Sequence, residues 1–245
     1  MSSRISIVTG ASGGLGKFIA RDLSRYGHVV VVSSRNPETL SRASEEGQKD
    51  GGTYMKHALD IRDRAQVNVL IDKVLEKYGR IDVLVNSAGF VHPRLDLENV
   101  KHDDLLDCFE TNVFGLFYLL QRVVPIMKAQ KSGVIINIAS KSARFAVPGL
   151  GVYSASKSAS LVLMQALAKE LSEANILCVT ICPSGMNTAM RALVYGEEDA
   201  AKQQDPESVA KIVYEIVCKT RSVPQGACVD VIRGEVVVNE MPNLP

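Results

Sequence analysis

The sequence predicts an α/β fold built on a doubly wound parallel sheet of about seven strands, with helices on both faces. Two observations predict it. Short β-branched runs bounded by Gly, Ser or Asn recur along the chain, and stretches with helical periodicity separate them. No internal repeat, low-complexity tract or flexible linker interrupts the 245 residues. We therefore expect a single domain over residues 1–245.

The expected elements follow one another in regular order. The strands are expected at residues 5–9, 29–33, 54–59, 81–85, 134–138, 176–181 and 227–231. The helices are expected at residues 14–26, 38–49, 63–78, 103–128, 152–173 and 206–219. Asn36 and Asp205 each precede a proline, which is typical of a capped first helical turn. The irregular amphipathic segment 186–204 follows the sixth strand and is expected to be a lid over the substrate.

Composition and charge limit the classes of partner. The formal net charge is +1, and Lys and Arg are scattered among acidic residues, so no nucleic acid is expected as a partner. The most apolar stretches, 113–120 and 161–167, fall well short of the ~18 uninterrupted apolar residues of a membrane span. The first residues lack the pattern of a signal peptide. We expect a cytoplasmic protein that binds a small molecule.

The five cysteines predict neither a disulfide framework nor a metal site. Cys108, Cys178, Cys182, Cys218 and Cys228 are odd in number and widely spaced, and four of them lie in apolar segments. Such cysteines are expected to be reduced thiols in the core. Cys178 and Cys182 lack the two-residue gap and the second ligand pair of a zinc site, so no metal is expected.

The first strand leads into the first helix through a glycine-rich turn. Gly10, Gly13, Gly14 and Gly16 allow the backbone to approach a pyrophosphate and aim the helix N-terminus at it. The spacing differs from Gly-x-Gly-x-x-Gly, because three residues separate Gly10 from Gly14. Nucleotide binding is favoured, and a plain connection between strand and helix remains the alternative.

The end of the second strand favours NADP(H) over NAD(H). A site that prefers NAD carries an acidic residue there, which binds the ribose hydroxyls. This chain has Ser33-Ser34-Arg35 instead. The Arg35 guanidinium can form a charge-assisted contact with a 2′-phosphate. The alternative is that Arg35 is a solvated turn residue.

Tyr153 and Lys157 are candidates for proton transfer. They lie four residues apart at the start of a predicted helix, and so share one helical face with about 6 Å between them along the axis. Tyrosine titrates near ~10 and is a poor base at neutral pH unless about 4 kcal/mol stabilises its phenolate. A neighbouring ammonium and an oxidised nicotinamide can supply that stabilisation.

Several short motifs occur together in an order that resembles the short-chain dehydrogenase/reductase (SDR) family. They are Thr9-Gly10-x-x-x-Gly14-x-Gly16, Asn86-Ser87-Ala88-Gly89, Asn112, Ser140 and Tyr153-x-x-x-Lys157. The resemblance covers nearly the whole chain. It implies a Rossmann-like single-domain fold and an oxidoreductase that transfers hydride between NADP(H) and a carbonyl or alcohol substrate.

The resemblance also implies a role for each catalytic candidate. Tyr153 would be the general acid/base, and Lys157 would lower its pKa and hold the nicotinamide ribose. Ser140 would hydrogen-bond the substrate oxygen, and Asn112 would anchor a water that joins Lys157 to solvent. Taken alone, Ser140 is equally a turn residue and Asn112 a helix cap or kink.

Further residues match cofactor contacts of the family. Asp60 resembles the acid that accepts from the adenine amino group, although a lone Asp there is also a helix cap. Two departures are Ser184, where the family commonly has Gly, and Ser87, where it commonly has Asn. The expected cofactor contacts are Gly10, Ser12, Gly14, Leu15, Gly16, Ser34, Arg35, Asp60, Ile61, Asn86, Ala88, Gly89, Tyr153, Lys157, Pro183, Gly185, Met186 and Thr188.

The substrate class stays open in the sequence. The resemblance implies that the substrate pocket is lined by residues just after Ser140, just after Asn86–Gly89 and in the segment 186–204. His92 is one of these candidates, and it is equally expected to be a surface histidine. The candidates are Phe90, Val91, His92, Lys141, Phe145, Val147, Met190 and Tyr195.

Excess apolar residues in the helices around 113–120 and 159–171 predict helix–helix contact between subunits, and the resemblance implies a homodimer or homotetramer. The alternative function is a non-catalytic NADP(H)-binding regulatory protein of the same fold. A structural module without a nucleotide is a third possibility.

Overall fold

The computed structural model describes residues 3–241. Its centre is one sheet in the order β3-β2-β1-β4-β5-β6-β7-β8, parallel throughout except for the β7–β8 pair. The strands are β1 (Ile5–Thr9), β2 (Val29–Ser34), β3 (Thr53–Ala58), β4 (Val83–Asn86), β5 (Gly133–Ile138), β6 (Ile176–Pro183), β7 (Cys228–Ile232) and β8 (Glu235–Asn239). The expected doubly wound sheet is confirmed.

The sheet has eight strands rather than about seven, because a hairpin adds β8 antiparallel to β7. Arg233 and Gly234 form the turn, with φ of 50° and 85°. Two successive left-handed residues let a two-residue loop follow the twist of the strands. The sequence signal was weak, because Arg-Gly is not a typical hairpin pair and two of the three central valines of β8 are exposed.

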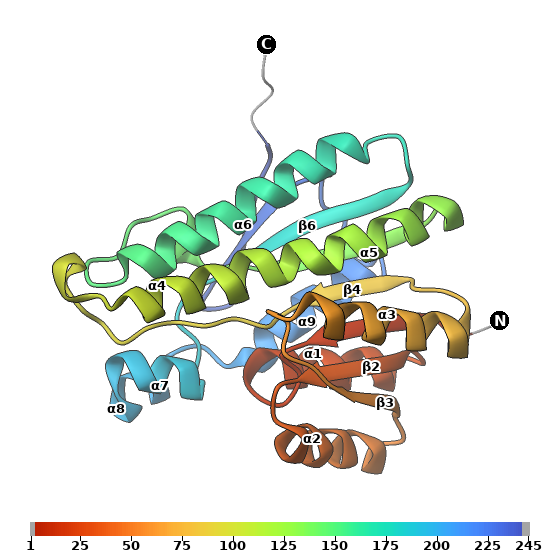
Figure 1. The fold of residues 1–245 in the computed structure, drawn as a ribbon, viewed down its shortest axis with the longest axis horizontal. Helices are drawn as coiled ribbons and strands as arrows, with labels where there is room; N and C mark the ends of the chain where they lie inside the picture. Colours follow the sequence, from red (N-terminus) through yellow and green to blue (C-terminus); the bar gives the residue numbers. More distant parts are fainter. Residues whose placement is uncertain (1–2, 242–245) are drawn as a thin grey trace.

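Helices cover both faces of the sheet and enclose two apolar cores. Side chains of α3, α5 and α6 pack on the face turned toward the viewer in Figure 1, and those of α1, α2 and α9 pack on the other. The helices are α1 (Gly14–Arg25), α2 (Pro37–Lys49), α3 (Arg64–Tyr78), α4 (His102–Phe109), α5 (Gly115–Gln130), α6 (Gly151–Glu170), α7 (Ala189–Tyr195), α8 (Glu197–Ala201) and α9 (Pro206–Val217).

Side chains cap several helices where the sequence indicated. The Asn36 side chain accepts from two backbone N–H groups of the first turn of α2, and Asp205 accepts from the backbone of Glu207 in α9. Each capping residue directly precedes a proline. Proline has no backbone N–H, and at the first position of a helix this group would have no partner within the helix. The caps therefore fix where these two helices begin.

The helix expected over residues 103–128 is two helices with a π turn between them. α4 ends at Phe109, the π turn spans Glu110–Phe114, and α5 begins at Gly115. A single extra residue in a helical turn does not change the spacing of apolar residues enough to be recognised in the sequence. Such π turns are frequent at functional sites. The π turn contains Asn112, one of the predicted catalytic residues.

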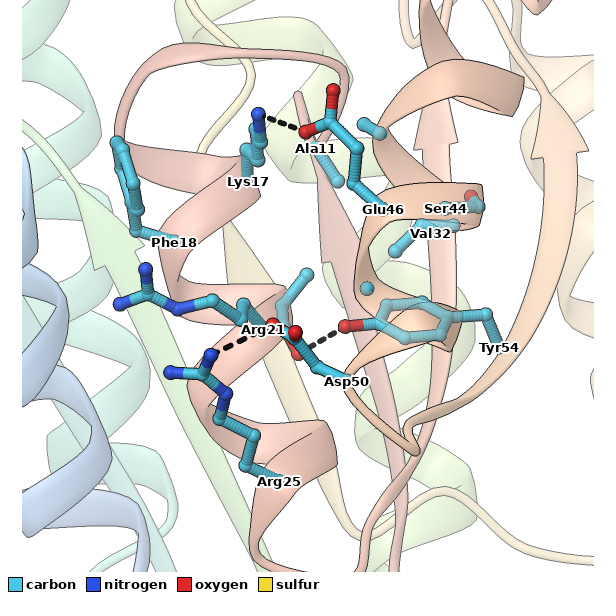
Figure 2. Close-up of a pocket in the computed structure, with 13 residues that line it drawn as sticks. Ala11, Lys17, Phe18, Arg21, Arg25, Val32, Ser44, Glu46, Asp50 and Tyr54 are labelled. Carbon is cyan, nitrogen blue, oxygen red and sulfur yellow. Dashed lines mark hydrogen bonds and ion pairs between the residues drawn. The ribbon is translucent and has the colours of Figure 1, made fainter.

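A small cavity of about 200 Å³ lies between α1 and α2. Figure 2 shows the ion pairs Lys17–Glu46 and Arg25–Asp50 beside it, and the Tyr54 hydroxyl donating to a backbone carbonyl of α1. These charges are already matched by neighbouring side chains. Within residues 3–241, the charged side chains that line the cavity thus have ion-pair partners and are not free to bind a ligand.

None of the helices within residues 3–241 combines the length and the apolar composition needed to cross a bilayer.

Candidate active site

A cleft of about 860 Å³ opens at the carboxyl edge of the sheet. Thr9, Ser34, Ile138 and Pro183 line it, and each is the last residue of a parallel strand. The strand order reverses between β1 and β4, so the two connections leave in opposite directions and open a crevice there. The topology itself thus creates the cleft.

Almost all of the predicted site residues gather along this cleft. The exceptions are Asn86 and Asn112, which lie behind its wall and are 1% exposed. The predicted residues that line it are Gly10, Ser12, Gly14, Leu15, Gly16, Ser34, Arg35, Asp60, Ile61, Ala88, Gly89, Ser140, Tyr153, Lys157, Pro183, Gly185, Met186 and Thr188.

The glycine-rich turn packs too tightly for side chains at two positions. A Cβ on Gly16 would lie 2.4 Å from the carbonyl oxygen of Gly10, and one on Gly10 would lie 2.8 Å from the backbone nitrogen of Ala88. Gly10 and Gly14 also have positive φ, at 66° and 51°. Glycine lets the turn, the start of α1 and the end of β4 meet in van der Waals contact.

A buried hydrogen-bond network fixes the turn after β4 against the glycine turn. Thr9 Oγ1 donates to Asn86 Oδ1 at 2.8 Å and accepts from the Ala88 backbone at 3.1 Å. Asn86 Nδ2 donates to Asn137 Oδ1 at 3.1 Å. Asn86 is therefore a positioning residue beneath the cleft. Asn137 was not singled out in the sequence, because it lies within the apolar strand β5 and matches no motif.

The end of β2 offers donors along one edge of the cleft. Arg35 is exposed there, and within residues 3–241 it has no carboxylate partner. Ser33 lines the cleft, and its buried Oγ lacks a hydrogen-bond partner in the described chain. A ligand with polar groups would satisfy that hydroxyl. Asp60 lies near, but Arg62 binds its carboxylate and lowers its pKa.

Tyr153 and Lys157 lie on the buried face of α6, at 8% and 5% exposure. Lys157 Nζ donates to the backbone carbonyl of Ile138 at 3.0 Å. Burial raises the pKa of Tyr153 to about 12, an effect that the hydroxyl of Ser140 opposes. Burial lowers the pKa of Lys157 to about 8. Desolvation thus dominates both groups, and the phenol is protonated at neutral pH.

Ser140 begins the short 3-10 turn Lys141–Ala143 at the end of β5. Its Oγ accepts from the Ser142 backbone at 3.1 Å, so it caps that turn, and it also faces the cleft. The capping role is observed, and it leaves the hydroxyl proton free to be donated, because a hydroxyl that accepts one bond can still donate its own proton.

Asn112 is bound on both sides of its amide. Its Oδ1 accepts from the Phe90 backbone at 2.9 Å, and its Nδ2 donates to the Phe90 carbonyl and to Ser156 Oγ, both at 2.9 Å. A Cβ on Gly89 would lie 3.3 Å from Lys157 Nζ and 3.4 Å from Asn112 Oδ1. The two polar groups therefore flank the same glycine.

The segment after β6 forms two short helices, α7 and α8, of which α7 lines the cleft. Thr188 caps α7 by accepting from the Arg191 backbone at 3.3 Å. Ser184, a departure from the family pattern, accepts from Gln204 Nε2 at 3.0 Å through its hydroxyl. The backbone of Asn187 donates to the Gln204 carbonyl at 2.9 Å. The two ends of the segment are thereby tied together.

The substrate candidates divide into lining and buried residues. His92, which was equally expected at the surface, is 0% exposed, with its Nδ1 2.6 Å from the Pro93 carbonyl oxygen. Neither His92 nor Phe90 lines the cleft; Arg191 and Val194, which the sequence did not single out, do. The candidates that do line it are Val91, Lys141, Phe145, Val147, Met190 and Tyr195.

The described cysteines are all free thiols. Cys182 and Cys228 meet beneath the cleft, with 3.2 Å between their Sγ atoms, and Asp230 lies beside them. The Asp230 carboxylate is bound by Arg144 and Asn239. Parallel register of β6 and β7 brings these residues together, a contact that sequence spacing does not reveal.

The chain is similar in sequence and in structure to proteins of one known family. The profile of short chain dehydrogenases matches residues 4–199. The 3-oxoacyl-[acyl-carrier-protein] reductase FabG of Thermotoga maritima is 29% identical, over 97% of this chain and 99% of its own.

Solved structures agree with that match. The Brucella melitensis 3-ketoacyl-(acyl-carrier-protein) reductase with NADH has a TM-score of 0.87 and 26% identity, over 94% of this chain and 97% of its own. An actinorhodin polyketide ketoreductase with NADPH has a TM-score of 0.88 and 29% identity, over 95% and 97%. The chain belongs to the short-chain dehydrogenase/reductase family of oxidoreductases.

Proposed function

We propose that the protein transfers hydride between NADP(H) and a carbonyl or alcohol substrate, with Tyr153 as the general acid/base. The observation that carries this proposal is the position of Tyr153 and Lys157, buried on one face of α6 in the wall of the cleft that the glycine turn also lines. Relatives that are ketoreductases, some with NADPH or NADH bound, support the reaction class.

The residues of the cleft fit a dinucleotide. The glycine turn presents the start of α1, whose N–H groups favour a pyrophosphate. The buried Ser33 hydroxyl is left for a ligand to satisfy. At the far end, Lys157, Gly185 and Thr188 would hold the nicotinamide half. When bound, the nicotinamide supplies or accepts the hydride.

Tyr153 and Ser140 would act on the substrate oxygen. In reduction, Tyr153 donates its proton to the carbonyl oxygen, and its raised pKa keeps that proton in place at neutral pH. Ser140 donates a hydrogen bond to the same oxygen and orients it. In oxidation Tyr153 would first lose its proton toward Lys157 and solvent, and its phenolate would then take the proton of the alcohol, while Ser140 would hydrogen-bond the product oxygen.

Lys157 and Asn112 would return the proton to Tyr153. Lys157 remains largely protonated at pH 7, since its pKa is about 8, and its charge favours the phenolate that proton donation leaves behind. Asn112 Oδ1 retains a second lone pair beside Lys157, which suits an ordered water. The Lys157–Ile138 hydrogen bond sets the position of the amine.

The reaction is tested by following NADPH oxidation at its absorbance against a panel of aldehydes and ketones. We expect turnover of at least one carbonyl compound by the wild type. Tight NADPH binding with complete inertness toward the panel, in wild type and Tyr153→Phe alike, would favour the alternative of a regulatory protein.

Arg35 is expected to set the preference for NADP(H). Charge-assisted bonds contribute about 1.5–3 kcal/mol, so Arg35→Ala is expected to weaken NADPH binding by about 10- to 100-fold. The affinity for NADH, which has no 2′-phosphate, should change much less. Fluorescence titration measures both constants, with Arg42→Ala on the exposed face of α2 as control. Wild-type binding of NADH as tight as that of NADPH would refute the assignment.

We propose one catalytic domain over residues 1–245, with the segment 186–204 as a lid. The single sheet and the ties between the two ends of the segment, Ser184 and Asn187 to Gln204, support this organisation. Closure of α7 and α8 would exclude water from the substrate end.

A homo-oligomer is proposed from apolar side chains on the π turn, α5 and α6. Phe114, Phe117 and Val162 are 46%, 41% and 61% exposed, more than isolated surface residues require. Light scattering is expected to give a mass at least twice 26.6 kDa. Val162→Lys should shift the protein toward the monomer, whereas Val69→Lys on α3 should not. A monomeric wild type at micromolar concentration would contradict the proposal.

A further inference from the structure

Two aromatic rings line the substrate end of the cleft, and each lies against two cations. The Phe145 ring centroid is 5.4 Å from Lys141 Nζ and 5.6 Å from Arg144 Cζ. The Tyr195 ring centroid is 3.6 Å from Arg191 Cζ. The second cation on Tyr195 is Arg94, at 5.8 Å. Four positive side chains therefore lie against these two rings, and two of them, Lys141 and Arg191, themselves line the cleft.

Carboxylates neutralise only two of these four cations. Arg144 pairs with Asp230, and Arg191 pairs with Asp199. Within residues 3–241, Lys141 has no acidic partner within ion-pair distance. The same holds for Arg94 in that part of the chain; its Nε donates to a backbone carbonyl. Among the described residues, the substrate end thus carries uncompensated positive charge.

The lining of the cleft reinforces this charge. Asp60 is the one acidic residue among the described residues that line it, and it lies at the cofactor end, where Arg62 binds it. At the substrate end, Asp199 and Asp230 lie outside the described lining, and each is paired with an arginine. Coulombic attraction there is therefore not cancelled locally.

Lys141 lies where it can contact an anionic group of the substrate. It directly follows Ser140, the residue proposed to hold the substrate oxygen, and it is half-buried beside apolar lining residues. A partly desolvated ammonium attracts an anion more strongly than an exposed one, because less water screens the pair. The turn that holds Ser140 therefore also presents a cation to the substrate.

We propose that the substrate end takes a carbonyl compound that carries a carboxylate, and that Lys141 binds this carboxylate. The inference rests on the proposed reaction and names its substrate class. Arg94 adds longer-range attraction from behind Tyr195, and Phe145 and Tyr195 provide flat apolar surfaces for the substrate skeleton.

A matched pair of substrates tests the proposal. NADPH oxidation is followed with 4-carboxybenzaldehyde and with its neutral methyl ester, methyl 4-formylbenzoate. We expect the wild type to prefer the acid by about tenfold or more in kcat/KM, and added salt to reduce that preference. Lys141→Met is expected to remove most of it and Lys141→Arg to retain it. Lys211→Met, an exposed lysine of α9, should leave the preference unchanged.

A binding measurement separates this inference from the proposed reaction. The unreactive pair 4-methylbenzoate and methyl 4-methylbenzoate is titrated calorimetrically into protein loaded with NADP(H). Tighter binding of the carboxylate, lost in Lys141→Met and kept in Lys211→Met, supports the inference whether or not any aldehyde is reduced. Equal binding of the two compounds by the wild type, or a preference that survives Lys141→Met, overturns it. Failure to reduce either aldehyde counts against the proposed reaction alone.

Discussion

Replacing Tyr153 by Phe is expected to lower kcat for carbonyl reduction by about 10²- to 10⁴-fold, the contribution typical of a positioned general acid. The phenol is protonated at neutral pH because burial raises its pKa to about 12, so it is ready to donate as the substrate oxygen gains charge. Phenylalanine keeps the ring in the wall of the cleft and removes only the proton donor. Stopped-flow or steady-state NADPH oxidation measures the loss.

The NADPH dissociation constant of Tyr153→Phe should stay within a few-fold of that of the wild type, which shows that the cleft is intact. Tyr78→Phe, at the end of α3, is the matched control, because it removes a phenol remote from the cleft. A Tyr153→Phe enzyme with undiminished kcat would show that another group delivers the proton.

Gly16→Ala is expected to disrupt both the cofactor turn and the packing beneath it. The new methyl would lie 2.4 Å from the carbonyl oxygen of Gly10, and backbone must move to admit it. Overpacking of this kind costs about 1–3 kcal/mol, which corresponds to a fall in Tm of about 2–12 °C for a chain of this size. NADPH affinity should fall by about 100-fold or more, because the displaced turn carries the N–H groups that face the pyrophosphate.

Calorimetric melting and fluorescence titration check the two effects separately. Gly151→Ala at the start of α6 is the control, since its Cβ would meet nothing within 4 Å. A Gly16→Ala protein with the Tm and NADPH affinity of the wild type would mean that the turn relaxes at no cost, contrary to the packing.

The sequence predicted those parts of the site whose residues are close along the chain. The glycines at the start of α1 and the Tyr153/Lys157 pair are only a few residues apart in sequence. Local backbone geometry therefore brings them close together in space. The ordered strands and helices were equally visible, because burial imposes their periodicity.

Features that depend on tertiary contacts could not be predicted in this way. The bonds of Thr9 and Asn86 to each other and to Asn137 join three strands, and no spacing within one strand indicates them. The burial of His92 depends on packing that its neighbours in sequence do not reveal. The contact between Arg94 and Tyr195 joins segments that only the fold brings together, whereas Lys141 and Arg144 are close to Phe145 along the chain.

The π turn at Glu110–Phe114 has a consequence for the register of the chain beyond it. One helical residue corresponds to a rotation of about 100°. Deleting a single residue there would restore a continuous α-helix and turn α5 by that angle, so that either its apolar stripe or the Asn112 amide would leave its partners. The widened turn lets both be satisfied at once, and insertions or deletions within it should be tolerated far less than in the loops around it.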